Sequence, residues 1–203
     1  MSKIKENSGV LIQGHIKIHD PESDKVFVDK RNAIHYENMS VALAESVANQ
    51  GQGFINSMSF GNGGTSVDPT GIITYLTPNS TGTNATLYNQ TYTKIVDDRS
   101  VSNLDPQRNK IETRHVNGTN YTDVVVTCLL DYGEPNGQDA VDGASASDSL
   151  YVFDELGLVS YSPSGAGKLL THVIFHPVQK SLNRLIQIDY TVRVQSLTGF
   201  NEG

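Results

Sequence analysis

The clearest pattern in the chain is a strict alternation of apolar and polar residues from Ile186 to Gln195. The apolar positions of this stretch are Ile186, Ile188, Tyr190, Val192 and Val194. Because successive side chains of a strand point to opposite faces, the alternation predicts a long strand with one buried face and one face in water. Such one-sided burial is typical of antiparallel sheets.

Two β-rich runs precede this strand, at Leu150–Phe153 and Leu169–Phe175. We expect the chain to bend after the first run at Gly157, because glycine has no Cβ to resist the bend. The second run should stop pairing near Pro177, which has no N–H to donate to a ladder. The linker 178–183 then predicts a hairpin with the final strand. Together the three runs predict a meander against which the rest of the chain packs.

The remaining pattern predicts shorter strands and one helix. The strands are expected at Val10–Ile18, Val26–Val28, Phe54–Phe60, Pro69–Leu76 and Val124–Leu130. The helix is expected at about residues 38–49, with Asn38 or Ser40 as its N-cap and Gly51 near its end. We predict a mainly β fold: an antiparallel β-sandwich with one accessory α-helix and long loops. Residues 1–9 would form an N-terminal arm and residues 10–203 a single β-sandwich domain.

Composition narrows the class of protein. A chain of 203 residues can bury enough surface to fold without disulfides or metals. Its net charge of -7 argues against a nucleic-acid binder, and no run is long and apolar enough for a membrane span. The N-terminus lacks the apolar core of a secretion signal, so we expect a soluble protein made in a reducing compartment. Cys128, the one cysteine, lies in an apolar run and is expected to be a small core residue.

Histidine spacing suggests a metal site only at first sight. His15 and His19 are four residues apart, as are His172 and His176. Both pairs lie in strand-like runs, where four residues span roughly 13 Å, which is too far for two ligands of one ion. The acidic stretch 139–148 lacks the alternating oxygen ligands of a calcium-binding EF-hand loop, so we expect a solvated loop there.

Catalytic patterns are also missing from the sequence. Gly165–Lys168 resembles the end of a phosphate-binding loop, but Ser162 replaces its leading glycine and Leu169 its Ser or Thr. Neighbouring carboxylates such as Asp154 and Glu155 should face opposite ways in a strand and so make a poor acid–base pair. We therefore expect no enzyme, no cofactor and no metal.

Two motifs resemble a known class of proteins. Met58–Gly64 joins a strand to a glycine turn, and Phe153–Leu158 contains an acidic Glu-Leu-Gly-Leu bend before a long terminal strand. This order resembles tailed-bacteriophage virion proteins, in particular the fibre-attaching and collar-type domains of tails. The resemblance covers the layout from Phe54 to Val194. This chain lacks the fibrous C-terminal extension of a tail fibre, so the resemblance favours a compact neck, collar, baseplate or capsid-decorating subunit.

The resemblance implies a non-enzymatic virion protein that forms part of an oligomeric ring in the neck, collar, tail or baseplate. Its partners would be itself and other virion proteins, with no nucleic acid or membrane, and its location the virion assembled in the host cytoplasm. The expected contact residues are Gly61, Asn62, Gly63, Gly64, Gln138, Asp139, Asp142 and Asp148. A capsid decoration or head-fibre subunit is the alternative. A carbohydrate-binding β module is a further one, although the chain has no tryptophan and scattered tyrosines.

Overall fold

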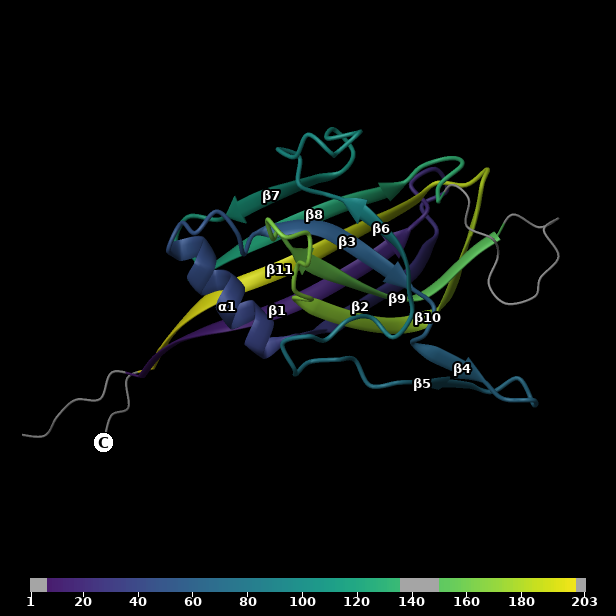
Figure 1. Ribbon diagram of the computed structural model, residues 1–203, viewed down its shortest axis with the longest axis horizontal. Coiled ribbons are helices and arrows are strands. Elements are labelled where there is room, and N and C mark those ends of the chain that lie inside the picture. The colour runs from purple at the N-terminus through teal and green to yellow at the C-terminus, as the bar shows by residue number, and fades with distance from the viewer. Residues whose placement is uncertain (1–6, 136–149, 200–203) are drawn as a thin grey trace, which may run out of the picture.

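The computed structural model describes residues 7–135 and 150–199 of the chain (Figure 1). Nine of the described strands form one antiparallel sheet in the order β6-β3-β9-β10-β2-β1-β11-β8-β7, and β4 and β5 pair separately. The first strands are β1 (Asn7–His19), β2 (Val26–Ile34), β3 (Ile55–Gly61), β4 (Thr65–Val67), β5 (Ile73–Tyr75) and β6 (Gln90–Ile95). The others are β7 (Lys110–His115), β8 (Tyr121–Leu130), β9 (Leu150–Ser160), β10 (Thr171–Ser181) and β11 (Ile186–Gly199). One helix, α1 (Tyr36–Val47), lies between β2 and β3.

The large sheet curls into two layers that face each other. The first layer holds β6, β3, β9 and β10, and the second holds β2, β1, β11, β8 and β7. Only two residue pairs join the layers through β10 and β2, Thr171 with Ile34 and His172 with Ala33. The structure thus confirms the predicted fold class, a mainly β antiparallel sandwich with one helix.

The core lies between the two layers, and β11 forms its centre as the alternation predicts. Tyr190 pairs with Ile16 of β1 on one side and with Val126 of β8 on the other, and all three side chains are fully buried. Aromatic rings of the first layer face them. The Phe153 ring meets the Phe60 ring edge-on at 5.4 Å between centroids, within the range in which such pairs are favourable.

The predicted hairpin between the last two strands is wrong. β10 pairs with β9 and β2, whereas β11 pairs with β1 and β8, so the chain crosses from one layer to the other between them. Both strands have an apolar inner face, and each buries it against the opposite layer. Alternation therefore identified the buried face correctly, but it carries no information on which strand lies alongside.

Two expected interruptions of the first layer also differ. Gly157 does not bend the chain but lies within β9; a Cβ there would come within 2.3 Å of the Thr171 carbonyl oxygen, so close strand approach requires glycine. Pro177 does not end β10. The pairing with β9 shifts register between Ile174 and Val178, so the proline lies in an irregularity where no ladder hydrogen bond is needed, and pairing then resumes.

The helix begins two residues earlier than predicted, and its N-cap is His35 rather than Asn38 or Ser40. The Nδ1 atom of His35 accepts a hydrogen bond from the Asn38 N–H at 3.2 Å. Asn38 instead lies buried in the first turn and donates its side-chain amide to the Leu169 carbonyl. A histidine acceptor is outside the usual capping residues, which is why the sequence pattern placed the start too late.

Three further boundaries differ from the prediction. β1 begins at Asn7 and pairs there with Gly199, so residues 7–9 of the predicted N-terminal arm belong to the sheet. Residues 1–6 lie outside the described part of the chain. β2 extends to Ile34, and the sequence pattern missed β4, β6 and β7 altogether. β7 is an edge strand with Lys110, Glu112 and Arg114 on one face and a single apolar residue, Ile111, on the other, so it shows no repeating apolar pattern.

Candidate functional site

Two buried carboxylates on β9, Asp154 and Glu155, join the two motifs that carry the phage resemblance. Asp154 is 3% exposed and Glu155 is fully buried. Both accept hydrogen bonds from the backbone of the glycine turn that follows β3. We call this pair the carboxylate clamp. A buried carboxylate requires several hydrogen-bond donors, and here most of them are backbone N–H groups of loops, so the clamp fixes those loops.

Glu155 holds two separate loops. Its Oε1 atom accepts from the N–H of Gly63 at 3.1 Å and of Asn89 at 2.8 Å, and its Oε2 atom accepts from the N–H of Tyr88 at 3.0 Å. Burial alone would raise the pKa of Glu155, but the hydrogen bonds from His172 and from these backbone groups outweigh burial and lower the pKa below its usual value. Glu155 is therefore an anion that organises main chain.

His172 completes the surroundings of Glu155. Its Nδ1 atom lies 2.8 Å from the Asn79 nitrogen, whose N–H it accepts, and its Nε2 atom lies 2.9 Å from Oε2 of Glu155. Because Nδ1 is an acceptor, the ring proton must be on Nε2, and a neutral imidazole donates to the carboxylate. His172 thus ties a third backbone segment to the clamp.

Asp154 anchors the root of a two-stranded projection. Its carboxylate accepts from the N–H of Gly64 and of Thr65, each at 2.9 Å, and from the Thr65 hydroxyl. From this point β4 and β5 run outward as a hairpin, which we call the arm (residues 65–76). At its tip, Asp68 accepts from the backbone N–H of Thr70 and Ile72 and so closes the turn. The arm is therefore anchored to the body at its root, and its tip turn is closed by its own side chain.

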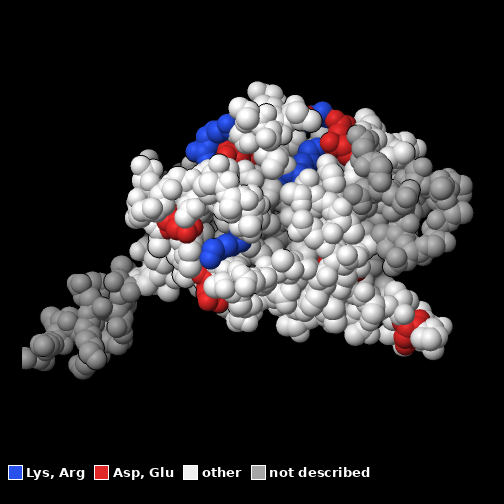
Figure 2. Space-filling view, in the orientation of Figure 1, with Lys and Arg blue, Asp and Glu red and all other residues white. Residues whose placement is uncertain are grey.

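The arm extends away from the sandwich at one end of the molecule (Figure 1). Its apolar side chains face solvent: Val67 is 61% exposed, Ile72 63%, Tyr75 50% and Leu76 42%. Figure 2 shows the arm as uncharged surface apart from an acidic spot near its tip, and Asp68 is its one charged residue. A lone two-stranded hairpin is marginally stable in water, and apolar side chains on it are seldom left uncovered.

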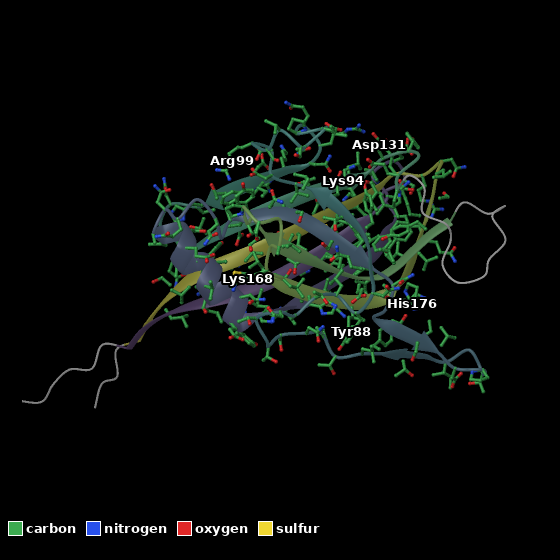
Figure 3. All side chains as sticks on the ribbon, in the orientation of Figure 1. Tyr88, Lys94, Arg99, Asp131, Lys168 and His176 are labelled. Carbon is green, nitrogen blue, oxygen red and sulfur yellow. The ribbon has the colours of Figure 1, made fainter. Side chains whose placement is uncertain are left out.

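Aromatic residues brace the arm where it leaves the body. The Tyr75 hydroxyl lies 3.3 Å from Nδ1 of His176 on β10, and the Tyr88 hydroxyl donates to the Thr77 carbonyl at 2.7 Å. Figure 3 places Tyr88 and His176 close to the base of the arm. These contacts hold the base on the first layer and leave the apolar side chains farther out unsupported.

The predicted contact residues divide into two groups. Gly61 and Gly64 are buried, and Asn62 and Gly63 are partly exposed. A Cβ on Gly61 would come within 2.4 Å of the Asn89 carbonyl oxygen and 2.5 Å of Oε1 of Glu155, so glycine is required there for the clamp. The buried glycines of this turn pack against β9, and the turn leads directly into the arm. The other predicted contacts, Gln138, Asp139, Asp142 and Asp148, lie outside the described residues.

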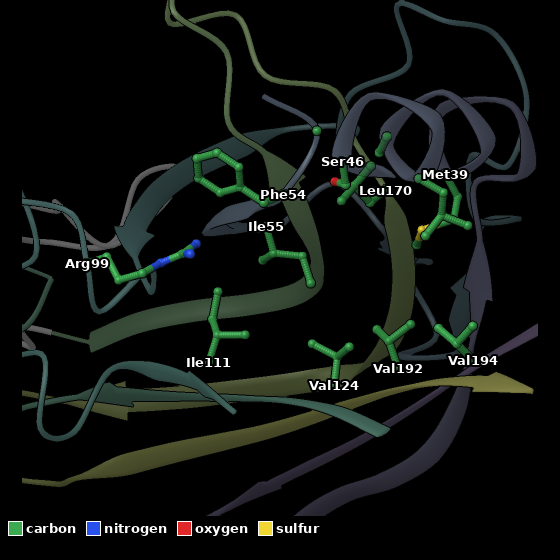
Figure 4. A pocket seen from close by; sticks show the side chains of 13 residues that line it. Met39, Ser46, Phe54, Ile55, Arg99, Ile111, Val124, Leu170, Val192 and Val194 are labelled. Carbon is green, nitrogen blue, oxygen red and sulfur yellow. The ribbon is translucent and has the colours of Figure 1, made fainter. Parts of the chain in front are cut away.

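A separate apolar cavity of about 200 Å³ lies where α1 covers one end of the sandwich (Figure 4). Met39 and Leu43 of α1, Ile55 of β3, and Val124 and Val192 of the second layer line it. The one charged group at its wall is Arg99, whose Nε bonds to Asp97 and whose guanidinium lies 5.3 Å from the centre of the Phe54 ring. The rest of the lining is almost entirely apolar, so the cavity is suited to a small apolar molecule.

The other end of the sandwich contains a charged cluster around a buried lysine. Lys180 is 1% exposed and donates to the carbonyls of Asp131 and Ser181, both at 2.9 Å. Burial lowers the pKa of Lys180 to about 8. Lys94 pairs with Glu134 and also donates to the Leu129 carbonyl at 2.7 Å (Figure 3). Through these two carbonyls, the Lys180 ammonium holds the turn at 131–135 against the end of β10.

No group of three or more metal-ligating side chains occurs among residues 7–135 and 150–199. His15 and His19 form separate contacts, with Asp29 at 2.8 Å and with Asp189 at 3.0 Å. In the same part of the chain, no helix has the length and apolar character needed to cross a membrane.

Comparisons of this chain with protein-family models, with curated protein sequences and with solved structures found no match. The resemblance to phage virion proteins therefore stays a prediction from the sequence.

Sequence reasoning missed the clamp as a unit. It singled out both motifs, but it treated Asp154 and Glu155 as facing opposite ways, and it did not place them against the glycine turn. A usable signal was present, because two successive carboxylates follow Phe153 in an otherwise apolar strand. Buried carboxylates require donors, and a glycine-rich turn exposes backbone N–H groups that can supply them.

Proposed function

We propose that this chain is a non-enzymatic structural subunit of a tailed-bacteriophage virion, placed in the neck, collar, tail or baseplate, where it forms part of a homo-oligomeric ring. The observation that carries this proposal is the arm. Two buried carboxylates fix its root, and yet Val67, Ile72, Tyr75 and Leu76 remain in solvent. An apolar hairpin that is anchored by buried carboxylates and still exposed to solvent is typical of a surface that binds another protein.

The contact between the two phage-like motifs adds support. The glycine turn after β3 and the acidic stretch of β9 meet through the hydrogen bond between Gly64 and Asp154, which are 90 residues apart in the sequence. Both motifs contribute to the position of the arm. The resemblance therefore refers to one structural unit and not to two coincidental segments. This favours an adhesive role within an assembly, which is the role that the resemblance implies.

The alternative position in the virion, that of a capsid decoration or head-fibre subunit, would use the same fold and the same arm. A carbohydrate-binding module is less well supported, because its aromatic candidates are engaged or dispersed. The Tyr121 ring lies under the Arg193 guanidinium at 3.8 Å, and the Tyr132 hydroxyl donates to Glu22 at 2.6 Å. The Tyr121 ring is thus covered by Arg193, and Tyr132, although half exposed, is a single ring whose hydroxyl is already engaged.

Composition of phage particles tests the proposal directly. Infectious tailed particles carrying this gene should contain the chain in a fixed number of copies, measured by quantitative mass spectrometry after density-gradient purification. Gold-labelled antibody against the chain should bind at the neck, tail or baseplate. Labelling of the capsid surface would instead favour the decoration alternative. Absence of the chain from purified particles would contradict the proposal.

A further inference from the structure

The second layer has a vacant strand position beside the first half of β1. β1 pairs with β11 from Asn7 to His19, but with β2 only from Gly14 onward. β2 leaves the sheet at Ile34, where the chain turns into α1. Across residues 7–135 and 150–199, no strand pairs with this side of Asn7–Gln13. Alternate backbone N–H and C=O groups of this segment are therefore available to another strand.

The vacant position is also an apolar groove. A hollow of about 350 Å³ lies between β1 and α1, lined by Val10, Leu11 and Ile12 on one side and by Tyr36, Met39 and Leu43 on the other. Val10 is 62% exposed and Tyr36 is 72% exposed. A strand added here would gain main-chain hydrogen bonds along one edge and would cover these side chains, which is the geometry of β-strand addition.

The arm carries a strand that suits this groove. β4 is the arm strand that approaches β10, so the outer edge of β5 faces away from the body. The segment Ile72–Leu76, Ile-Ile-Thr-Tyr-Leu, has no charged residue, and neither has Asn7–Gln13. Natural proteins protect free strand edges with charges, as β7 does with Lys110 and Glu112 at the end of the sheet. Two uncharged free edges on one chain indicate that both are covered in use.

We propose that β5 of one copy pairs with the free edge of β1 in the next copy, so that Ile72–Leu76 lies in the groove between β1 and α1. The arm and the groove lie toward opposite ends of the long axis (Figure 1), so the contact is between copies and repeats head to tail. A head-to-tail contact generates a closed ring when its rotation closes. This inference rests on the proposed function, because it names the surfaces that would build the ring.

Site-directed cross-linking tests the pairing. Val10→Cys in the groove and Thr74→Cys on β5 both place a thiol at an exposed position, whereas native Cys128 is fully buried. A short bismaleimide should cross-link a mixture of the two variants into covalent dimers that contain one copy of each, because each copy has one accessible thiol. Each variant alone should cross-link no more than the wild type, because every head-to-tail contact would then hold only one thiol.

The outcomes separate this inference from the proposed function. Cross-linking of either variant with itself would mean a two-fold contact, which overturns the head-to-tail inference but leaves an oligomeric virion subunit in place. Wild-type chain that is oligomeric by light scattering, with no cross-link in the mixture, would also overturn only the inference. Wild-type chain that is monomeric and absent from phage particles would overturn both.

Edge charges provide a second test that does not depend on cross-linking. Leu11→Lys and Ile72→Lys each place a charge on one of the two edges, and both should shift assembly to roughly tenfold higher protein concentration or abolish it. Val101→Lys is the matched control, because Val101 is fully exposed in the 97–109 loop and belongs to neither surface. An equal effect of all three changes would contradict the proposed contact.

Discussion

Three buried charged side chains, Asp154, Glu155 and Lys180, each hold main-chain groups of a loop. Glu155 and Asp154 accept from backbone N–H groups, and Lys180 donates to two carbonyls. A charge in a low-dielectric interior is costly unless it is fully hydrogen-bonded, so each of these residues makes its loop conformation a condition of folding.

Glu155→Gln should therefore destabilise the protein by about 3 kcal/mol, because the amide can accept at only one of the two positions that now receive backbone N–H groups. Urea denaturation followed by circular dichroism measures the change. Glu112→Gln on β7, where the carboxylate faces water, is the control and should leave the midpoint unchanged. An unchanged midpoint for Glu155→Gln would contradict the role of the clamp.

Stability at low pH should report on the same residue. The folded-state pKa of Glu155 is lowered, so its contribution is fully present above the unfolded value of about 4.3 and is lost as the pH falls through the folded-state pKa. Below roughly pH 5, the free energy of unfolding of the wild type should fall more steeply than that of Glu155→Gln, because this pH range contains the carboxyl pKa. Parallel pH profiles would show that Glu155 is not held as an anion.

Cys128 should be unreactive in the folded protein. Burial raises the pKa of its thiol to about 12, and its side chain is fully buried on the inner face of β8. An aromatic disulfide reagent at pH 8 should therefore modify it only at the rate of unfolding, and modification should accelerate in urea. Val10→Cys supplies the exposed thiol for comparison. Rapid stoichiometric reaction of native wild type would place Cys128 outside the core.

At the level of elements, the sequence predicted the positions of strands better than it predicted which strands pair with each other. Alternation located β11 and the buried side of β8, since the burial of every second residue follows from the pleat. It did not show that β10 and β11 lie in opposite layers, because an apolar face is the same whether its neighbour is across a hairpin or across the core. β7 was not predicted because its charged outer face and its single inner apolar residue give no repeating apolar pattern. The clamp required proximity between residues about 90 apart, which no local pattern contains.

The local stability of the arm should depend more on the hydrogen bonds at its root than on those at its tip. Asp154→Ala removes the acceptor for the N–H groups of Gly64 and Thr65, so amides of β4 and β5 should exchange with deuterium faster while those of β11 keep their protection. Asp68→Ala, which opens only the tip turn, should affect fewer arm amides. Unchanged arm exchange in Asp154→Ala would mean that the clamp does not hold the arm.

On the scale of the whole molecule, a rigid sandwich carries complementary features toward its two ends. One end holds out an apolar hairpin, and the other has a vacant strand position beside α1. The polar outer face of the second layer is crossed by ion pairs such as Arg193 with Asp123 at 2.7 Å, which suits contact with water. This distribution supports assembly through the ends of the molecule and not through the flat face.

The mass of the purified chain in solution tests this account most directly. Sedimentation equilibrium over a wide range of protein concentration should show association of the wild type into one defined oligomer, and Ile72→Lys should reduce that association while leaving the circular dichroism spectrum unchanged. A wild-type chain that stays monomeric at every concentration, with its arm intact by hydrogen exchange, would contradict the claim that the arm exists to join copies of this protein.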